Sequence, residues 1–405
     1  MEPLYKVFNK YDNKTFEETS RIRQISPSIQ KCGLIIKPLN SFKSHELYYI
    51  PSVEMLKLTE EIFEIDQKIS EEFNSLPHVA KKRYIIESIV DELQNTNEIE
   101  GVRSSREEIV RSARALTNNT NEKERFSSMV ASYAKLTSNE LTKINNPEDI
   151  RKIYDYLLEG EIEKNELPDG KIFRKDQCVV YKKSGTLKEI HKGVYPEEKI
   201  IEHIVKLIEF VNSDSHSLLI KIAIAHYYFG YIHPFYDGNG RISRFVSSMY
   251  LKGKFSPITS LSLSRGCNKF VEKYLTAFEN TNKSSNRGEM NQFIVSFLEI
   301  IKDTQLEMLE EIKEKVYLLE QFIEHMENDE IVTELSEFEQ NVIYVLGQNL
   351  LFSSDKGLTA KELHTIFNEK SIQSFRRILN HLEGLGIVGV IGEKPKIYYI
   401  SDDFF

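Results

Sequence analysis

Cysteine is scarce in this chain of 405 residues, which has only Cys32, Cys178 and Cys267. The number is odd, the three lie far apart, and neither a CxxC pair nor an HExxH motif occurs. This pattern argues against a disulfide framework and against a structural zinc site. It fits a protein of a reducing compartment.

Long apolar runs are also missing. No stretch approaches the roughly 18 uninterrupted apolar residues that a membrane-spanning helix needs. The opening residues, MEPLYKVFNKYDNK, lack the apolar core of a signal peptide. We therefore expect a cytoplasmic protein without membrane contact. The net charge of -9 does not favour nucleic acid as a partner, although a local basic patch is compatible with it.

Apolar spacing predicts a mainly helical protein of about two or three domains. Residues 53–73 and 80–96 have helical periodicity, and a further helix is expected to start with a Ser-x-x-Glu cap at Ser104. Residues 217–232 are apolar on nearly every face, which predicts a buried central helix. Residues 171–191 differ, because two extended runs around a Ser-Gly pair predict a β-hairpin.

The tail, residues 334–405, has the pattern of a separate unit. Three helical stretches (337–350, 359–367 and 371–386) precede two short strands (387–392 and 396–400), an order that resembles a winged helix. The third stretch carries Arg376, Arg377, Gln373 and Asn380, which could contact DNA. Glutamates are interspersed along this tail and the whole protein is acidic, which favours a role in binding proteins instead.

The stretch HPFYDGNGRISR, residues 233–244, concentrates chemistry in one turn. Its glycines expose successive backbone N–H groups at the start of a helix, which is a ready anion site. Arg241 and Arg244 share a helix face and can bind further phosphate groups. Asp237 offers a hard oxygen ligand for Mg²⁺, and His233 can act as a general base. The parts together predict transfer from a polyphosphate to a hydroxyl.

Each fragment alone is common: DGNG is an ordinary turn, and two arginines can form a solvated face. Their combination resembles the signature of the Fic family, His-x-Phe-x-Asp/Glu-Gly-Asn-Gly-Arg-x-x-Arg, with every fixed position matched over residues 233–244. The resemblance covers roughly residues 45–300. It implies a mostly helical core and transfer of AMP from ATP, with Mg²⁺, to a Ser, Thr or Tyr hydroxyl of a target protein.

Carried over by position, the resemblance makes His233 the base and Asp237 the metal ligand. It also implies that the 171–191 hairpin is a flap that holds the target backbone as an added strand. Tyr274 aligns with a family tyrosine near the nucleotide, with core packing as the alternative. The nucleotide-binding residues implied are Gly238, Asn239 and Gly240 for the α-phosphate, Arg241 and Arg244 for the β- and γ-phosphates, and Tyr274.

A second resemblance concerns control. TNEIEG, residues 96–101, resembles the family's inhibitory motif, Ser/Thr-x-x-x-Glu-Gly/Asn. It implies that Glu100 pairs with Arg244 and displaces the γ-phosphate, since a carboxylate can fill the same guanidinium fork. The alternative is a simple helix cap.

These observations lead to one expected architecture: residues 1–110 with the inhibitory helix, a Fic core over 111–300, a linking helix over 301–333, and a winged-helix-like unit over 334–405. We expect an autoinhibited protein adenylyltransferase that uses ATP and Mg²⁺ and also modifies itself. The alternatives are AMP removal or another nucleotide on the same scaffold, and a DNA-binding regulator. The formation of a homodimer is left as an alternative, and nucleic acid is the less favoured partner.

Overall fold

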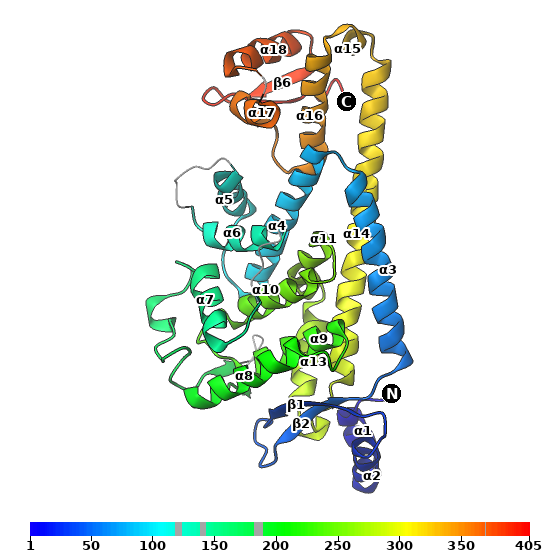
Figure 1. Cartoon of the computed structure of the whole chain (residues 1–405), viewed down its shortest axis with the longest axis vertical. Helices are drawn as coiled ribbons and strands as arrows, with labels where there is room; N and C mark the ends of the chain where they lie inside the picture. Colours follow the sequence, from blue (N-terminus) through cyan, green and yellow to red (C-terminus); the bar gives the residue numbers. More distant parts are fainter. Residues whose placement is uncertain (118–123, 138–142, 182–188, 369) are drawn as a thin grey trace.

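The computed structural model describes residues 1–117, 124–137, 143–181, 189–368 and 370–405. The protein is mainly helical, as predicted, with three small antiparallel sheets among these residues (Figure 1). The helices are α1 (Leu4–Lys10), α2 (Asn13–Gln24), α3 (Val53–Ser75), α4 (His78–Glu100), α5 (Arg106–Thr117), α6 (Ser127–Leu136), α7 (Pro147–Leu157), α8 (Glu197–Asn212), α9 (Leu218–Ile232), α10 (Asn239–Lys252), α11 (Pro257–Ser260), α12 (Leu263–Lys269), α13 (Val271–Thr281), α14 (Asn291–Asn328), α15 (Glu330–Glu334), α16 (Glu337–Phe352), α17 (Ala360–Phe367) and α18 (Ile372–Gly384), with 3-10 turns at Lys164–Glu166 and Ser284–Asn286. The strands are β1 (Gln30–Ile36), β2 (His45–Tyr49), β3 (Val179–Tyr181), β4 (Glu189–Lys192), β5 (Leu358–Thr359), β6 (Val388–Ile391) and β7 (Ile397–Ile400).

The helix α14 runs along most of the long axis of the molecule, with α3 beside it (Figure 1). Their apolar faces meet α4 and α16 in a shared core that includes Ile69, Tyr84, Ile312 and Phe352. The helices α4 to α13 lie on one side of this pair, and the last elements of the chain lie at one end. The long helix therefore connects the predicted core to the C-terminal unit.

The helix α9 is the centre of the core, as its uniformly apolar sequence predicted. Nearly all of its side chains are buried, and Tyr227 and Ile232 are completely so. Helices α8 and α10 pack against it, and the 233–244 stretch runs from the end of α9 into the first turns of α10. The functional motif is thus held between two buried helices.

The predicted hairpin is present in its described part. Strands β3 and β4 pair antiparallel, with Val180 opposite His191. The Ser-Gly turn falls within residues 182–188, outside the described residues. Hydrogen bonds from Val194 N to Ile232 O (3.0 Å) and from Arg174 N to Pro234 O (3.2 Å) attach the hairpin base to the motif.

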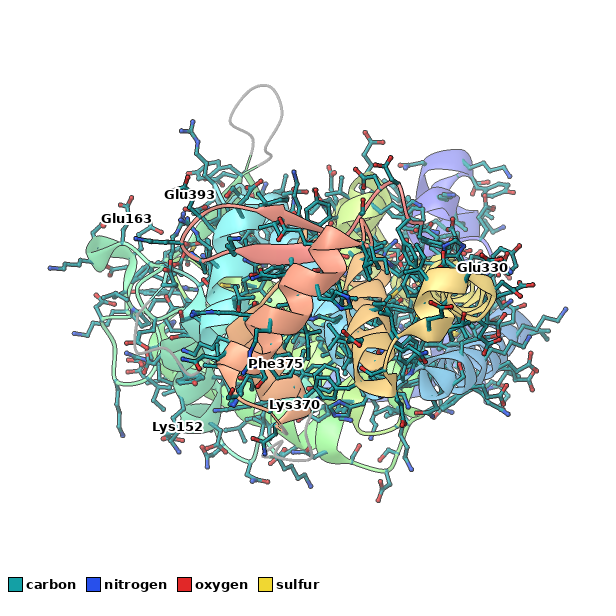
Figure 2. All side chains as sticks on the ribbon, turned by 90° about the horizontal axis from the view of Figure 1, so that it is seen from above. Lys152, Glu163, Glu330, Lys370, Phe375 and Glu393 are labelled. Atoms are coloured by element: carbon teal, nitrogen blue, oxygen red, sulfur yellow. The ribbon has the colours of Figure 1, made fainter. Side chains whose placement is uncertain are left out.

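The C-terminal unit has its own apolar core, which includes Phe375, Leu379 and Tyr398. Its helices and last two strands occur where the sequence predicted them, and β5 adds a third strand in the order β5-β7-β6. Figure 2 looks onto this end, where Lys370 and Glu393 are exposed and Phe375, a residue of α18, is buried. The exposed charges are of both signs, and the winged-helix assignment stays a prediction.

Two details differ from the sequence expectations. The cap of α5 is not at Ser104 but one residue later, where Ser105 Oγ accepts from Glu108 N (3.2 Å) and Ser105 N donates to Glu108 Oε2 (2.9 Å). The predicted boundaries at 110/111 and 300/301 fall inside the continuous helices α5 and α14. The apolar periodicity of the sequence identifies the buried face of a helix. It does not show at which residue a helix passes from one hydrophobic core to the next.

Near the N-terminus, β1 pairs antiparallel with β2, a strand that was not predicted. The helices α1 and α2 were not predicted either. They are tied to the rest of the chain by a buried ion pair between Arg23 and Glu289. Among the described helices, none combines the length and apolar character needed to cross a bilayer.

Candidate active site

The loop between α9 and α10 is shaped by backbone conformation. His233 ends α9 with φ 52° and ψ 62°, and Gly238 precedes α10 with φ 83°. The left-handed conformation suits glycine, because a side chain there is strained. Asn239 closes the loop, since its Oδ1 accepts from Phe235 N (2.9 Å) and its Nδ2 donates to Phe235 O (2.8 Å).

An aromatic layer lies under the loop. Phe235 is completely buried and stacks on Tyr154 with ring centroids 3.9 Å apart. Phe173 meets the same ring edge-on at 5.5 Å. These ring contacts fix Phe235 in the core below the loop.

His233 is partly buried and its main chain is fixed by the hairpin base, because Arg174 Nε donates to its carbonyl oxygen (2.8 Å). Its Nδ1 lies 3.4 Å from Gly230 O. A proton on Nδ1 leaves the lone pair of Nε2 free to accept a proton. Burial, together with His191 and Arg174, lowers the pKa of His233 to about 4. The imidazole is therefore neutral at pH 7, as a general base must be.

Asp237 and Arg241 form an ion pair at the start of α10. Arg241 Nη2 donates to Asp237 Oδ2 (2.9 Å), while Gly238 N donates to Oδ1 (2.6 Å). The carboxylate is 39% exposed, but the guanidinium of Arg241 is completely buried. Its Nε and Nη1 have no hydrogen-bond partner among the residues that the structure describes. Buried donors without acceptors are costly, so this corner fits an added anion.

Arg244, one turn further along α10, is 1% exposed and holds the end of α4. Its Nε donates to Thr96 Oγ1 (2.9 Å) and its Nη2 to Thr96 O (3.2 Å). The same Nη2 donates to Glu100 Oε1 at 2.7 Å. The ion pair expected from the sequence is therefore present, and α4 ends directly after it at Gly101, with φ 77°.

The Glu100 carboxylate lies over the first turn of α10. A Cβ built on Gly240 would be 2.0 Å from Glu100 Oε1 and 3.1 Å from Arg244 Nη1. The first N–H groups of a helix have no acceptor inside the helix and attract anions. Glu100 thus lies where a phosphate group bound to this helix end would be.

Tyr274 belongs to the core around the site. It is 5% exposed, and its hydroxyl is 2.6 Å from His226 Nε2. His226 is buried, and its other ring nitrogen is 2.9 Å from Ser247 Oγ. These contacts are those of core packing, and a place for Tyr274 near the nucleotide stays a prediction.

Two residues of the site were not assigned a role from the sequence. Arg174 is completely buried and donates to the carbonyl oxygens of His233, Asp176 and Val194. Because these acceptors are main-chain atoms, nothing in the sequence indicated this role. Thr96 was visible as the first residue of the inhibitory motif, but its bonds to Arg244 depend on the way α4 crosses α10.

Residues 143–251 match the model of the Fic/DOC family. The matched segment contains the hairpin and the whole 233–244 motif, but not Glu100 or the C-terminal unit. Fic-family proteins are in general transferases that move a nucleoside monophosphate or a related group to a target.

The fold is similar to that of solved Fic structures. A Fic family protein from Desulfovibrio desulfuricans is 16% identical, with a TM-score of 0.53 over 87% of this chain and 98% of that one. A Fic domain-containing signalling protein from Bacteroides thetaiotaomicron is 17% identical, with a TM-score of 0.40 over 62% and 97%. Fic-1 (residues 134–508) from C. elegans is 21% identical, with a TM-score of 0.42 over 64% and 73%. The first likeness shows a similar fold, and the family match shows a Fic/DOC-like segment at residues 143–251.

Proposed function

We propose that this protein transfers AMP from ATP to a Ser, Thr or Tyr hydroxyl of a target protein, and that Glu100 restrains the reaction. The observation that carries the proposal is the arrangement at the start of α10. This helix start brings together a neutral His233, the Asp237 carboxylate and two buried arginines. The Glu100 carboxylate lies at the same helix start, where a phosphate group would bind.

In the proposed reaction the target oxygen bonds to the α-phosphorus of ATP. The bond from that phosphorus to the bridging oxygen breaks, and pyrophosphate leaves. Nε2 of His233 takes the proton of the hydroxyl. The N–H groups of residues 238–240 bind the α-phosphate, and Arg241 and Arg244 bind the β- and γ-phosphates.

The donor set at Asp237 fits Mg²⁺. Magnesium in nucleotide sites takes one or two carboxylates and completes its shell with phosphate oxygens and water. Asp237 is partly exposed at the site, and no group of three potential His, Cys, Asp or Glu ligands occurs among the described residues. When bound, the ion would neutralise charge on the phosphates, with Asp237 as its protein ligand.

The partner is a protein with an acceptor hydroxyl, docked as an added strand on the 171–191 hairpin. The hairpin base supports this, because it is bonded to the same residues that carry His233. Self-modification and a cytoplasmic location belong to the proposal, and a homodimer stays compatible with it.

The test is transfer of label from α-labelled ATP with Mg²⁺, with the protein alone and in cell lysate. We expect weak labelling by the wild type, strong labelling by Glu100→Ala, and none by the double variant Glu100→Ala/His233→Ala. His216→Ala, which removes another partly exposed histidine, is the matched control for His233. Absence of labelling in folded Glu100→Ala would overturn the proposal.

AMP removal from a modified target is the second candidate. It is favoured by one observation: the partly exposed Glu100 carboxylate lies at the start of α10, where it could orient a water molecule. Release of AMP from a pre-modified target without ATP consumption would support removal. In that case Glu100→Ala would lose activity instead of gaining it.

A further inference from the structure

The helix α4 ends at the active site, but its position is set elsewhere. Glu92, Thr96 and Glu100 follow at intervals of four residues and form one stripe along the helix. Thr96 and Glu100 bind Arg244, while Glu92 is completely buried and turned to α12. The stripe therefore has two anchors, one at each end.

Glu92 binds the start of α12. Its Oε1 and Oε2 each accept from Ser264 N at 2.8 Å, and Oε2 also accepts from Arg265 N at 3.3 Å. A buried carboxylate is retained only when its oxygens are satisfied, and main-chain N–H groups at a helix start satisfy them well. The contact fixes α4 along its axis relative to α12.

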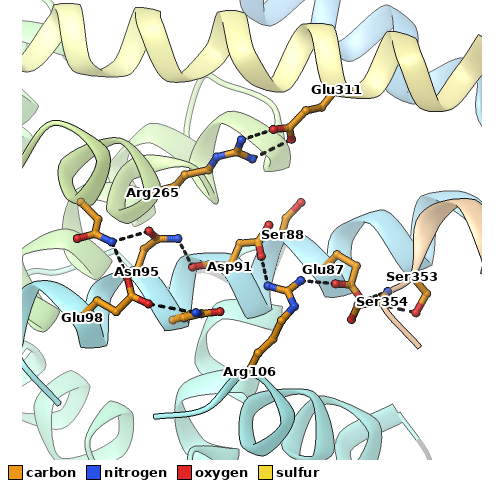
Figure 3. Close-up of polar contacts among 12 residues, drawn as sticks. Glu87, Ser88, Asp91, Asn95, Glu98, Arg106, Arg265, Glu311, Ser353 and Ser354 are labelled. Atoms are coloured by element: carbon orange, nitrogen blue, oxygen red, sulfur yellow. Dashed lines mark hydrogen bonds and ion pairs between the residues drawn. The ribbon is translucent and has the colours of Figure 1, made fainter. Parts of the chain in front are cut away.

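Asn268, at the other end of α12, binds the neighbouring face of α4. Its Nδ2 donates to Asn95 Oδ1 (2.9 Å) and to Glu98 Oε2 (2.7 Å) (Figure 3). Because Asn95 and Glu98 lie beside the stripe of Glu92, contacts at both ends of α12 oppose rotation of α4.

The short helix α12 is itself immobilised on α14. Arg265 Nη1 donates to Glu311 Oε2 at 2.9 Å, and both guanidinium ends meet that carboxylate (Figure 3). The backbones approach closely at Gly266, where an added Cβ would lie 2.3 Å from Thr304 Oγ1. A rigid connection thus runs from α14 through α12 to α4.

We propose that Glu92 and Asn268 are positioning residues that hold Glu100 on Arg244, and we call their contacts with α12 and α4 the α12 clamp. The inference rests on the proposed function, because it concerns the strength of the proposed inhibition. Loosening the clamp lets the end of α4 shift, weakens the Glu100–Arg244 pair and gives the γ-phosphate access to Arg244. The clamp touches no substrate. Asn268 acts only through the position of Glu100, whereas the buried Glu92 carboxyl group also interacts with the charge of Arg244.

The test compares ATP and ADP affinities by calorimetry with Mg²⁺, in a His233→Ala background that prevents turnover. Glu100 opposes the γ-phosphate, so its displacement is expected to raise the affinity for ATP and leave that for ADP unchanged. We expect Asn268→Ala to raise the ATP:ADP affinity ratio about 5-fold, as the loss of one net hydrogen bond predicts. Glu92→Gln should raise it by about 10-fold, because an amide NH₂ would face the N–H groups of α12.

The matched control is Lys269→Ala. Lys269 neighbours Asn268, but it pairs with Glu307 on α14 and leaves α4 untouched, so we expect an unchanged ratio. In the Glu100→Ala background, Asn268→Ala should not change the ratio further. Thermal melts identify any variant that fails to fold, and Asn268→Ala, at a partly exposed residue, keeps the test valid if Glu92→Gln does not fold.

Each outcome decides the matter. If Glu100→Ala raises the ratio but folded Asn268→Ala behaves like Lys269→Ala, the clamp is refuted and the inhibition stands. If the clamp variants act equally in the presence and absence of Glu100, they act on the nucleotide site and not through Glu100. If Glu100→Ala itself leaves the ratio unchanged, the inhibitory role of Glu100 fails and the clamp falls with it.

Discussion

Removing the Glu100 carboxylate should destabilise the protein without nucleotide. Arg244 is 1% exposed and donates to Glu100 Oε1 at 2.7 Å. Loss of one partner from a fully buried pair costs about 3–5 kcal/mol. Here the Glu100 side chain is 22% exposed and Arg244 keeps two bonds to Thr96, so we expect about 1–2 kcal/mol for Glu100→Ala. For a chain of this length that lowers the melting temperature by about 1–4 °C.

ATP should reverse the effect. A ligand at a hundred times its Kd stabilises a protein by about 2.7 kcal/mol. In the variant the γ-phosphate replaces the lost carboxylate on Arg244, whereas in the wild type it must first displace Glu100. Mg²⁺-ATP at one fixed concentration should therefore raise the melting temperature more in His233→Ala/Glu100→Ala than in His233→Ala. ADP should raise both equally, since it carries no γ-phosphate.

The assay is thermal unfolding of both proteins with no nucleotide, with ADP and with ATP. Equal ATP shifts in the two proteins would refute the argument, because Glu100 would then not compete with the γ-phosphate. Unchanged stability of the nucleotide-free variant would show that Thr96 and solvent already satisfy Arg244.

Further perturbations test other parts of the site. Since the pKa of His233 is lowered to about 4 and the base acts when neutral, kcat/KM of Glu100→Ala measured against pH should stay level from pH 7 to 5 and fall below about pH 4. Burial lowers the pKa of His226 to about 3. On acidification this histidine is therefore protonated in the unfolded chain at a higher pH than in the folded protein, which favours unfolding. Denaturant titration should show a loss in unfolding free energy between pH 7 and 5, and His226→Gln should reduce that loss by about 2 kcal/mol. Gly238→Ala places a Cβ 2.4 Å from Leu158 Cδ1 at φ 83°, so the same titration should show a loss of about 1–3 kcal/mol, with lower transfer activity. Arg174→Met leaves three carbonyl groups without their donor, and we expect about 3 kcal/mol lower stability and reduced labelling of target.

Much of the helical architecture could be predicted because burial imposes a period on the sequence. The segment that became α9 shows this, since a helix apolar on every face can only lie in a core. The hairpin could be predicted from its two β-rich runs. The five-residue strand β2 could not, because HELYY is too short to show alternation, and besides β1 it bridges to Glu289, which is far away in the sequence.

The candidate site divides in the same way. Local chemistry within residues 233–244 indicated a phosphate-binding helix start, and the left-handed Gly238 agrees with it. The pair of Glu100 with Arg244 spans 144 positions, and it was expected only through resemblance to a known motif. Arg174 and the α12 clamp were not expected, because they join segments far apart in the sequence, partly through main-chain atoms.

Glu100 can inhibit nucleotide binding by its charge as well as by the space that its side chain fills. Arg174, Arg241 and Arg244 are among the largest fully buried side chains of the protein. Arg174 is held by backbone carbonyl groups at the hairpin base. The two arginines of α10 instead pair with carboxylates, Arg241 with Asp237 and Arg244 with Glu100. Glu100 offsets the charge of Arg244 in the resting site and lowers its attraction for the γ-phosphate. Displacing Glu100 leaves the charge of Arg244 without this partner. The inhibitory glutamate therefore removes both the space and the electrostatic potential that a triphosphate would use, and any movement of α4 would restore the two together.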